Sequence, residues 1–152
     1  MMVVGAQDLL VAPVFVPGAD PAHHPPGAVA LFPSAELLES PEDALATKGS
    51  VWISGVDTDE LAEAARLATE AGVEPSTLVL ECPSTTVPAL VAAGHTVAVC
   101  PDDEGMEPGG SLEATVVAAL AAGAVFVRTS HTDAARRAMD VTAALATEAA
   151  LR

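Results

Sequence analysis

A regular succession of apolar runs and amphipathic segments begins near residue 51. Each apolar run has three or four residues without polar alternation, which is typical of strands in a parallel sheet that is buried on both faces. A segment with helical periodicity follows each run. The pattern predicts strands at 51–54, 77–80, 96–99 and 125–127, and helices at 57–71, 84–93, 111–122 and 132–149.

The expected helix ends carry suitable residues. Asp57 can accept hydrogen bonds from the first turn of its helix, and Glu60 can reach back to it, as in a capping box. The apolar stripe of the same helix consists of Leu61, Ala64, Ala65 and Leu67. Ser84 can cap the next helix. Glycine, which commonly ends helices in a left-handed conformation, follows three of them, at Gly72, Gly94 and Gly123.

The first 50 residues have a less regular pattern. It predicts two strands and one short helix, at 9–16, 29–32 and 36–46. Pro13 and Pro41 interrupt the first strand and the helix, and the segment 17–27, with four prolines and the pair His23–His24, predicts a stiff loop. We therefore expect one α/β domain over 1–152, with an irregular part over 1–50 and regular βα repeats over 51–152.

Strands that alternate with helices predict an α/β fold with a parallel sheet. A complete eight-stranded barrel takes about 200 residues or more, and this chain has 152. We therefore expect a truncated or partial TIM-barrel-like sheet, with an open doubly wound sheet as the alternative. Either sheet has an exposed edge strand. A second copy or a partner chain would cover that edge, which predicts a homodimer or a complex.

Composition narrows the classes of partner. Hydrophobic residues make up 51% of the chain and aromatic residues 3%, so Ala, Val and Leu must build the core. With 21 acidic and 6 basic residues, the net charge is -15. This charge argues against nucleic acids and anionic membranes, both of which require a basic face. The N-terminus does not resemble a secretory leader, and no apolar run is long enough to span a membrane, so we expect a cytoplasmic protein.

Ligands of βα folds bind at the C-terminal ends of the strands. The polar residues expected there are Ser54, Glu81, Cys82, Ser84, Asp102, Asp103, Glu104, Arg128, Ser130 and His131. Arg128 offers a fork of donors beside the start of the last helix, whose free N–H groups also favour anions. These residues predict a site for a small anion. In the alternative, structural interpretation, Ser130 or Thr132 caps the last helix and Arg128 pairs with a carboxylate.

Three further groups have plain structural explanations. Asp102–Glu104 with Glu107 could hold a hard cation, but a solvated acidic loop explains them. His23–His24 offer two ligands only and fit a surface loop. Cys82 and Cys100 lack metal-site spacing and fit two reduced thiols, with Cys82 as a nucleophile near a helix N-terminus as the alternative. We therefore expect no metal and no cofactor.

The segment from Gly110 to Arg128, GSLEATVVAALAAGAVFVR, resembles the last part of the dihydropteroate synthase family. That family has a GS-L-A-A helix, then Gly-Ala and a strand ending in Arg-x-His. Leu78–Pro83 stands where the family has a strand ending in Asp-Pro-Gly, and residues 95–99 stand where it has the strand before Ser-Arg-Lys. The resemblance covers residues 51–148, the C-terminal half of the family. It implies a TIM-barrel enzyme that joins a pterin pyrophosphate to p-aminobenzoate.

The residues that the resemblance carries over depart from the family's motifs. Arg128 matches the Arg that holds pyrophosphate, but Ser130 replaces the accompanying His, and His131 stands one position late. Glu81 stands in place of the pterin-binding Asp. The Lys position falls in the acidic segment 100–103, which would repel a pyrophosphate. The resemblance therefore implies a shared scaffold without dihydropteroate synthase activity.

Together these features predict a non-catalytic dihydropteroate synthase-like protein that acts as a small-molecule or protein-binding module. A small anion or a pterin-like molecule is the expected ligand. Two alternatives stay open. One is an enzyme of another reaction with its site at Glu81, Asp102, Arg128 and His131, and the other is a structural subunit that completes the barrel of another chain.

Overall fold

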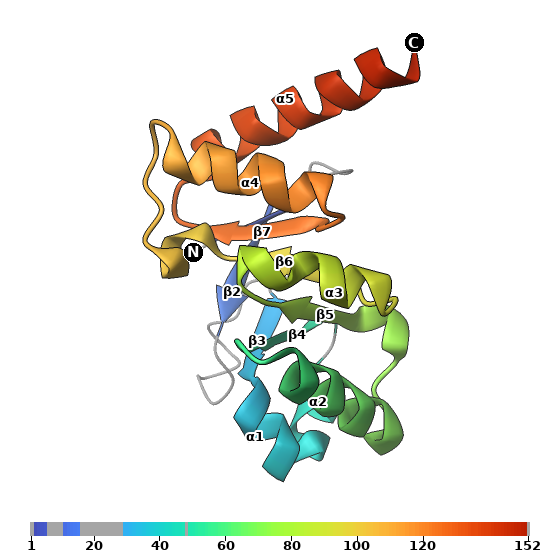
Figure 1. The fold of residues 1–152 in the computed structure, drawn as a ribbon. Helices are drawn as coiled ribbons and strands as arrows, with labels where there is room; N and C mark the ends of the chain where they lie inside the picture. Colours follow the sequence, from blue (N-terminus) through green and yellow to red (C-terminus); the bar gives the residue numbers. More distant parts are fainter. Residues whose placement is uncertain (1, 6–10, 16–28, 48, 152) are drawn as a thin grey trace.

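The computed structural model describes residues 2–5, 11–15, 29–47 and 49–151, and the strands of this part form a closed barrel (Figure 1). Seven strands follow one another around it: β1 (Met2–Gly5), β2 (Val11–Phe15), β3 (Val29–Pro33), β4 (Val51–Ser54), β5 (Leu78–Glu81), β6 (Val97–Val99) and β7 (Phe126–Thr129). Neighbours from β2 to β7 are parallel. The predicted α/β fold with a mostly parallel, partial TIM-barrel-like sheet is confirmed, and the open doubly wound alternative does not form.

β1, which the sequence pattern did not predict, closes the barrel. It pairs antiparallel with both β2 and β7, and Met2 lies opposite Pro13 on one side and Thr129 on the other. Four residues are too few for a hydrophobic period to be recognised. Because β1 fills the gap between β2 and β7, the described sheet has no open edge. The expected open edge is therefore absent from the described sheet, and the predicted homodimer or partner chain stays a prediction.

The described helices lie outside the barrel, and each of them comes after one of the strands β3 to β7 in the chain (Figure 1). They are α1 (Ser34–Glu39), α2 (Thr58–Ala71), α3 (Val87–Ala92), α4 (Ser111–Ala121) and α5 (Thr132–Ala150), with short 3-10 helices at Pro41–Ala46, Pro75–Thr77, Ser84–Thr86 and Pro101–Glu104. The short helix expected at 36–46 is thus divided in two, because α1 ends at Glu39, Ser40 is not helical and a 3-10 helix begins at Pro41. None of the described helices combines the length and the apolar character needed to cross a bilayer. The predicted loop at 17–27 with His23–His24 lies outside the described residues.

α2 shows how far local sequence dictates a helix. The Asp57 carboxylate accepts hydrogen bonds from the N–H groups of Asp59 and Glu60, and Gly72 ends the helix with a φ of 117°. The Glu60 carboxylate accepts a hydrogen bond from Ser34 Oγ at 3.0 Å. Glu60 therefore joins α2 to α1, a role that differs from its predicted part in a capping box.

Alternation of side chains along the strands produces two apolar layers. The layer inside the barrel consists of Val3, Val29, Trp52, Val79 and Ala98, with Leu31 and Phe126 packed against them. Trp52 is 1% exposed, its ring lies 5.5 Å from that of Phe126, and its indole N–H donates to Ser50 Oγ at 3.1 Å. The larger layer, with Ile53, Leu80 and Val97 among its members, packs between the strands and the helices.

Candidate functional site

The barrel interior is polar at the C-terminal ends of the strands, in contrast to the apolar layer around Trp52. Side chains two positions further along β4 to β7 point to the same face of the sheet. These positions hold Ser54, Glu81, Cys100 and Arg128, and we call these four residues the mouth of the barrel. The period of two thus collects a hydroxyl, a carboxylate, a thiol and a guanidinium where the strands end.

Arg128 and Glu81 form a buried ion pair across the mouth. The Arg128 guanidinium donates from Nε to Glu81 Oε2 at 2.8 Å and from NH2 to Glu81 Oε1 at 2.8 Å. Their side chains are 11% and 6% exposed. NH2 also donates to Asp103 Oδ2 at 2.9 Å. Hydrogen bonding with Glu81 raises the pKa of Arg128 further above its already high value, so the guanidinium stays charged.

Asp102 binds the turn between β7 and α5. Its carboxylate accepts hydrogen bonds from the hydroxyl of Thr129, the hydroxyl of Ser130 and the backbone N–H of Ser130. Burial acts to raise the pKa of Asp102, but these donors outweigh it, with the charge of His131 contributing, and the pKa lies below its ordinary value. The ionised carboxylate therefore holds the start of α5 against the loop after β6.

Glu104 binds the turn after β5. Its Oε1 accepts hydrogen bonds from Ser84 Oγ at 2.7 Å and from Ser84 N at 3.2 Å. Its second oxygen, Oε2, is buried and has no hydrogen-bond partner among the described residues. Ser84 therefore uses its hydroxyl to hold Glu104, whereas Pro83 is the residue at the helix N-cap; the prediction that Ser84 caps a helix is wrong.

Three consecutive acids thus engage three separate groups of donors. Asp102, Asp103 and Glu104, which we call the acidic triplet, lie on the 3-10 helix that follows β6. Asp102 binds the turn before α5, Asp103 binds Arg128, and Glu104 binds Ser84. In parallel βα folds, anions bind to such donors at strand ends and helix N-termini. Here carboxylates of the chain itself occupy them.

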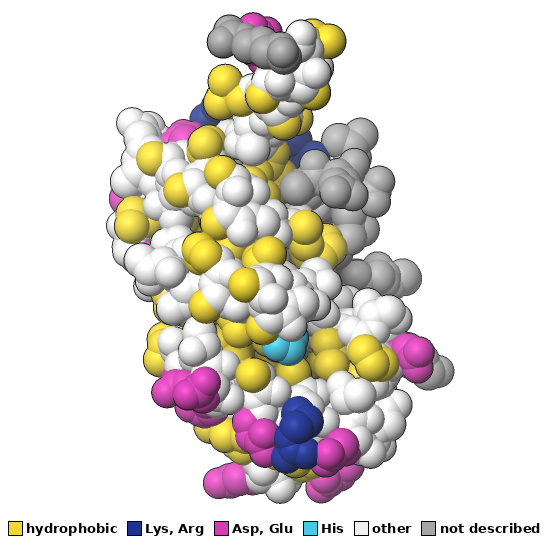
Figure 2. All heavy atoms as spheres, turned by 45° about the vertical axis from the view of Figure 1, so that its right-hand side comes forward, with side chains coloured by type: hydrophobic (Ala, Val, Ile, Leu, Met, Phe, Trp, Pro, Cys, Tyr) yellow, Lys and Arg dark blue, Asp and Glu magenta, His cyan; other side chains and the backbone are white. Residues whose placement is uncertain are grey.

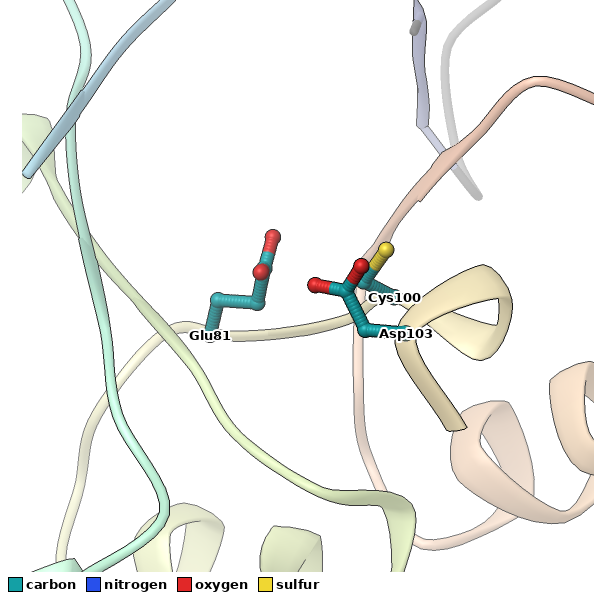
Figure 3. Close-up of side chains that lie close together, drawn as sticks. All are labelled: Glu81, Cys100 and Asp103. Carbon is teal, nitrogen blue, oxygen red and sulfur yellow. The ribbon is translucent and has the colours of Figure 1, made fainter. Parts of the chain in front are cut away.

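The two cysteines lie on opposite faces of the sheet. Cys82 belongs to the outer apolar layer, whereas Cys100 points toward Glu81 and Asp103 (Figure 3). Burial raises the pKa of Cys82, and it raises that of Cys100 to about 12. Both thiols therefore stay protonated at neutral pH, which argues against Cys82 as an activated nucleophile.

Glu81, Cys100 and Asp103 have the composition of a metal site but already hold a cation. Their ligand atoms lie within 4.8 Å of one another. Arg128 NH2, however, lies within 2.9 Å of an oxygen of each of the two carboxylates. A metal ion would have to displace this guanidinium and deprotonate Cys100. The arrangement therefore fits an ion pair better than a metal centre.

A pocket of about 320 Å³ opens beside the mouth. It is lined by Ser54, Gly55, Val56, Glu81, Cys82, Pro83, Cys100, Asp103 and Glu104. Three of these residues, Glu81, Asp103 and Glu104, are acidic, and ionised carboxylates only accept hydrogen bonds. Its volume is at the lower end of the range for small-molecule sites, which begins at about 300 Å³.

The structure brings together most of the residues that the sequence singled out. Glu81, Asp103 and Arg128 form one network, in which the predicted pairing of Arg128 with a carboxylate is present. Asp102 binds the neighbouring turn at Thr129 and Ser130. His131 is the N-cap residue of α5, which has no side-chain cap, so the predicted cap by Ser130 or Thr132 is wrong. Sequence analysis missed Thr129, whose buried hydroxyl binds Asp102, and gave Cys100 no place in the site. Cys100 directly follows β6, and Thr129 is the last residue of β7. Position at the end of a strand is therefore the sequence signal that the two residues share.

Asp102→Asn is expected to lower the free energy of unfolding at pH 7 by about 1–2 kcal/mol, because an amide nitrogen would face the donors of Ser130. The folded-state pKa of Asp102 lies below its ordinary value of 3.8. Its contribution is therefore present above pH 3.8 and disappears as the pH falls through the folded-state value. Urea unfolding between pH 7 and pH 2 should show the two proteins converging below about pH 4. Asp140→Asn, at an exposed position of α5, is the control and should stay close to the wild type throughout.

Comparison with known proteins gives a structural match. No protein-family model matches the chain, and no curated protein is similar to it in sequence. A solved dihydropteroate synthase from Coxiella burnetii, in complex with pteroic acid, superposes with a TM-score of 0.60 and 18% sequence identity. The match covers 77% of this chain and 59% of that structure. At this identity the likeness shows that the chain has a dihydropteroate synthase-like fold, and it shows the fold alone.

Proposed function

We propose that this chain is a non-catalytic, dihydropteroate synthase-like binding module whose strand-end pocket holds a small, pterin-like molecule. The observation that carries the proposal is the acidic triplet, Asp102 to Glu104. Each of its carboxylates occupies a donor group that an anionic substrate would need. The chain therefore has the fold of the synthase, but its own carboxylates are bound to the groups that would otherwise bind an anion.

The occupied donors argue against transfer from a pyrophosphate ester. The resemblance implies that the Arg on the last strand holds the pyrophosphate, and Arg128 at that position is bound to Glu81 and Asp103. A pyrophosphate at this place would meet both carboxylates at close range without a free cation to offset them. For the same reason, the pocket disfavours a small anion, which is the other predicted ligand.

The chemistry of the pocket favours a ligand rich in N–H groups. Glu81, Asp103 and Glu104 are among the residues that line a space of about 320 Å³. A flat heterocycle with ring N–H and amino groups can donate to such acceptors, and charge-assisted hydrogen bonds are stronger than neutral ones. Pterins have this pattern, and the similar solved structure contains a pterin-bearing molecule, pteroic acid.

Two assays on the purified full chain test the proposal. Incubation with dihydropterin pyrophosphate and p-aminobenzoate should yield no dihydropteroate; its formation would refute the non-catalytic assignment. Titration calorimetry should detect binding of pterin but not of inorganic pyrophosphate. Ser54→Phe, which fills the pocket from the end of β4, should abolish pterin binding, whereas Ser76→Phe, at an exposed position, should retain it. Absence of pterin binding, or binding that survives Ser54→Phe, would remove this ligand assignment.

A further inference from the structure

The two helices on either side of β5 leave part of this strand uncovered. α1 packs against α2, and α4 packs against α5, whereas α2 and α3 hardly touch each other. α3 has only 6 residues, and α2 has 14. Because α3 is too short to pack along the whole of α2, a groove is left between the two helices.

The groove has a volume of about 350 Å³ and an apolar floor. Its buried lining consists of Ala65, Leu78 and Leu80, and its exposed lining includes Glu70 and Thr96. Leu78 begins β5, and Thr96 directly precedes β6, so the groove extends to the N-terminal ends of these strands. It shares no lining residue with the pocket beside the mouth. What binds in it is therefore independent of a ligand at the mouth.

The α2 side of the groove is acidic. Arg66 donates two hydrogen bonds to Glu63 and a third to Glu70. One guanidinium offsets only one of these two carboxylates, and Glu74, which is exposed, directly precedes the groove residue Pro75. Residues 34–74 contain 10 acidic and 2 basic residues, a net charge of -8 out of the -15 of the whole chain.

The α3 side of the groove has no such charge. Residues 84–99 contain no Asp, Glu, Lys or Arg, and α3 exposes Pro88, Ala89 and Ala92. Figure 2 shows acidic side chains around a basic one on the lower part of the molecule, with hydrophobic side chains directly above them. The groove therefore has an apolar floor, one acidic wall and one uncharged wall.

We propose that the groove between α2 and α3, defined by Ala65, Glu70, Leu78 and Thr96, is the docking surface for an amphipathic helix of a partner protein with Lys or Arg along one edge. A helix is about 10–12 Å across, so the groove receives the side chains of its apolar face. The basic edge of the helix lies over Glu70 and Glu74. Recognition of this kind uses apolar residues at positions i, i+3, i+4 and i+7 of the bound helix.

The form of the groove favours a helix over other peptide conformations. The described sheet is a closed barrel, so a partner cannot add a strand to an open edge of it. Polyproline segments bind in grooves lined by aromatic side chains, and no Phe, Trp or Tyr lines this groove.

The charge of the groove favours a basic partner. A second copy of this chain would bring a net charge of -15 to a wall that is already acidic, and the two would repel each other. Nucleic acids and anionic membranes would be repelled for the same reason. A helix with Lys or Arg along one edge is complementary to the acidic wall, and such complementarity both selects a partner and accelerates association.

The test uses two fluorescein-labelled peptides of about 20 residues, long enough to form a helix. The Lys peptide has leucines at alternating intervals of three and four residues and lysines along one edge; in the Glu peptide, glutamates replace the lysines. Anisotropy titration with the full chain should show saturable binding of the Lys peptide and none of the Glu peptide. Glu70→Lys/Glu74→Lys should weaken binding on the order of tenfold or more, because two attractive contacts become repulsive.

Two matched controls separate docking in the groove from attraction to the total charge. Glu107→Lys/Asp140→Lys changes the net charge by the same amount at exposed positions outside the groove and should keep an affinity close to that of the wild type. Thr96→Trp, which fills the groove, should abolish binding, whereas Thr85→Trp, at an exposed position outside it, should retain binding. Far-ultraviolet circular dichroism should be the same for all variants.

Three results would overturn the proposal. The first is no binding of the Lys peptide to the wild type. The second is an equal loss in the two Lys variants, or binding that survives Thr96→Trp. The third comes from light scattering: a wild type of twice 15.2 kDa that falls to the mass of one chain in Glu70→Lys/Glu74→Lys would assign the groove to a second copy.

Discussion

Replacing Trp52 by alanine is expected to lower the free energy of unfolding by about 3–5 kcal/mol. Trp52 is 1% exposed and is the largest side chain in the layer inside the barrel. Its neighbours, among them Val79, Ala98 and Phe126, come from strands whose backbones are held by ladder hydrogen bonds. The barrel wall therefore cannot collapse onto the space that the indole leaves, and a cavity adds to the lost burial.

Urea unfolding followed by far-ultraviolet circular dichroism measures this loss, because the variant lacks the only tryptophan of the chain. Leu45→Ala provides the control, since Leu45 is 48% exposed on the outside of the molecule. It should change the free energy of unfolding by less than about 1 kcal/mol. A Trp52→Ala variant with a loss of this smaller size would mean that Trp52 does not fill the closed barrel described above.

Arg128→Met is expected to cost about 3–5 kcal/mol at pH 7, because it leaves the Glu81 carboxylate charged, buried and without its cation. The two groups share two hydrogen bonds of 2.8 Å, and their side chains are 11% and 6% exposed. Chemical denaturation of the wild type and the variant at pH 7 measures the loss.

A second substitution separates the lost pair from lost packing. Arg128→Met/Glu81→Leu removes both charges and should recover most of the stability, since replacing a buried ion pair by apolar residues is often neutral or stabilising. Arg66→Met is the control for an exposed pair, because Arg66 and its partners Glu63 and Glu70 lie at the surface of α2. It should have a much smaller effect. A double variant as unstable as Arg128→Met would show that the loss comes from packing of the Arg128 side chain.

The predicted elements agree with the structure where local signals are strong. α2 begins after Asp57 and ends at Gly72, as the capping residue and the glycine indicated. The strands from β3 to β7 lie within two residues of their predicted bounds. By contrast, Glu60 and Ser84 have the right chemistry for capping, yet each forms a hydrogen bond with a side chain far away in sequence. In both residues the side chain forms a tertiary hydrogen bond in place of the local bond to backbone that capping requires.

The candidate site, too, was predictable only as far as local signals in the sequence reach. Position at a strand end identified Glu81, the acidic triplet and Arg128, because parallel strands bring their C-terminal ends to one edge. Which acid meets which donor was beyond sequence analysis. Arg128 and Glu81 are 47 residues apart and lie on strands separated by β6. Their contact depends on the curvature that brings β5 and β7 around the barrel.

By itself, the sequence determined the alternation of strands and helices, the burial of the strands on both faces and the location of polar residues at the strand ends. These features depend on periods of two and 3.6 residues and on capping groups, all of which act over a few positions. Only the tertiary structure decided that β1 closes the barrel, that the acidic triplet occupies the donors of the mouth and that a groove is left between α2 and α3. These features depend on which distant segments become neighbours, and long-range pairing of this kind has no local period.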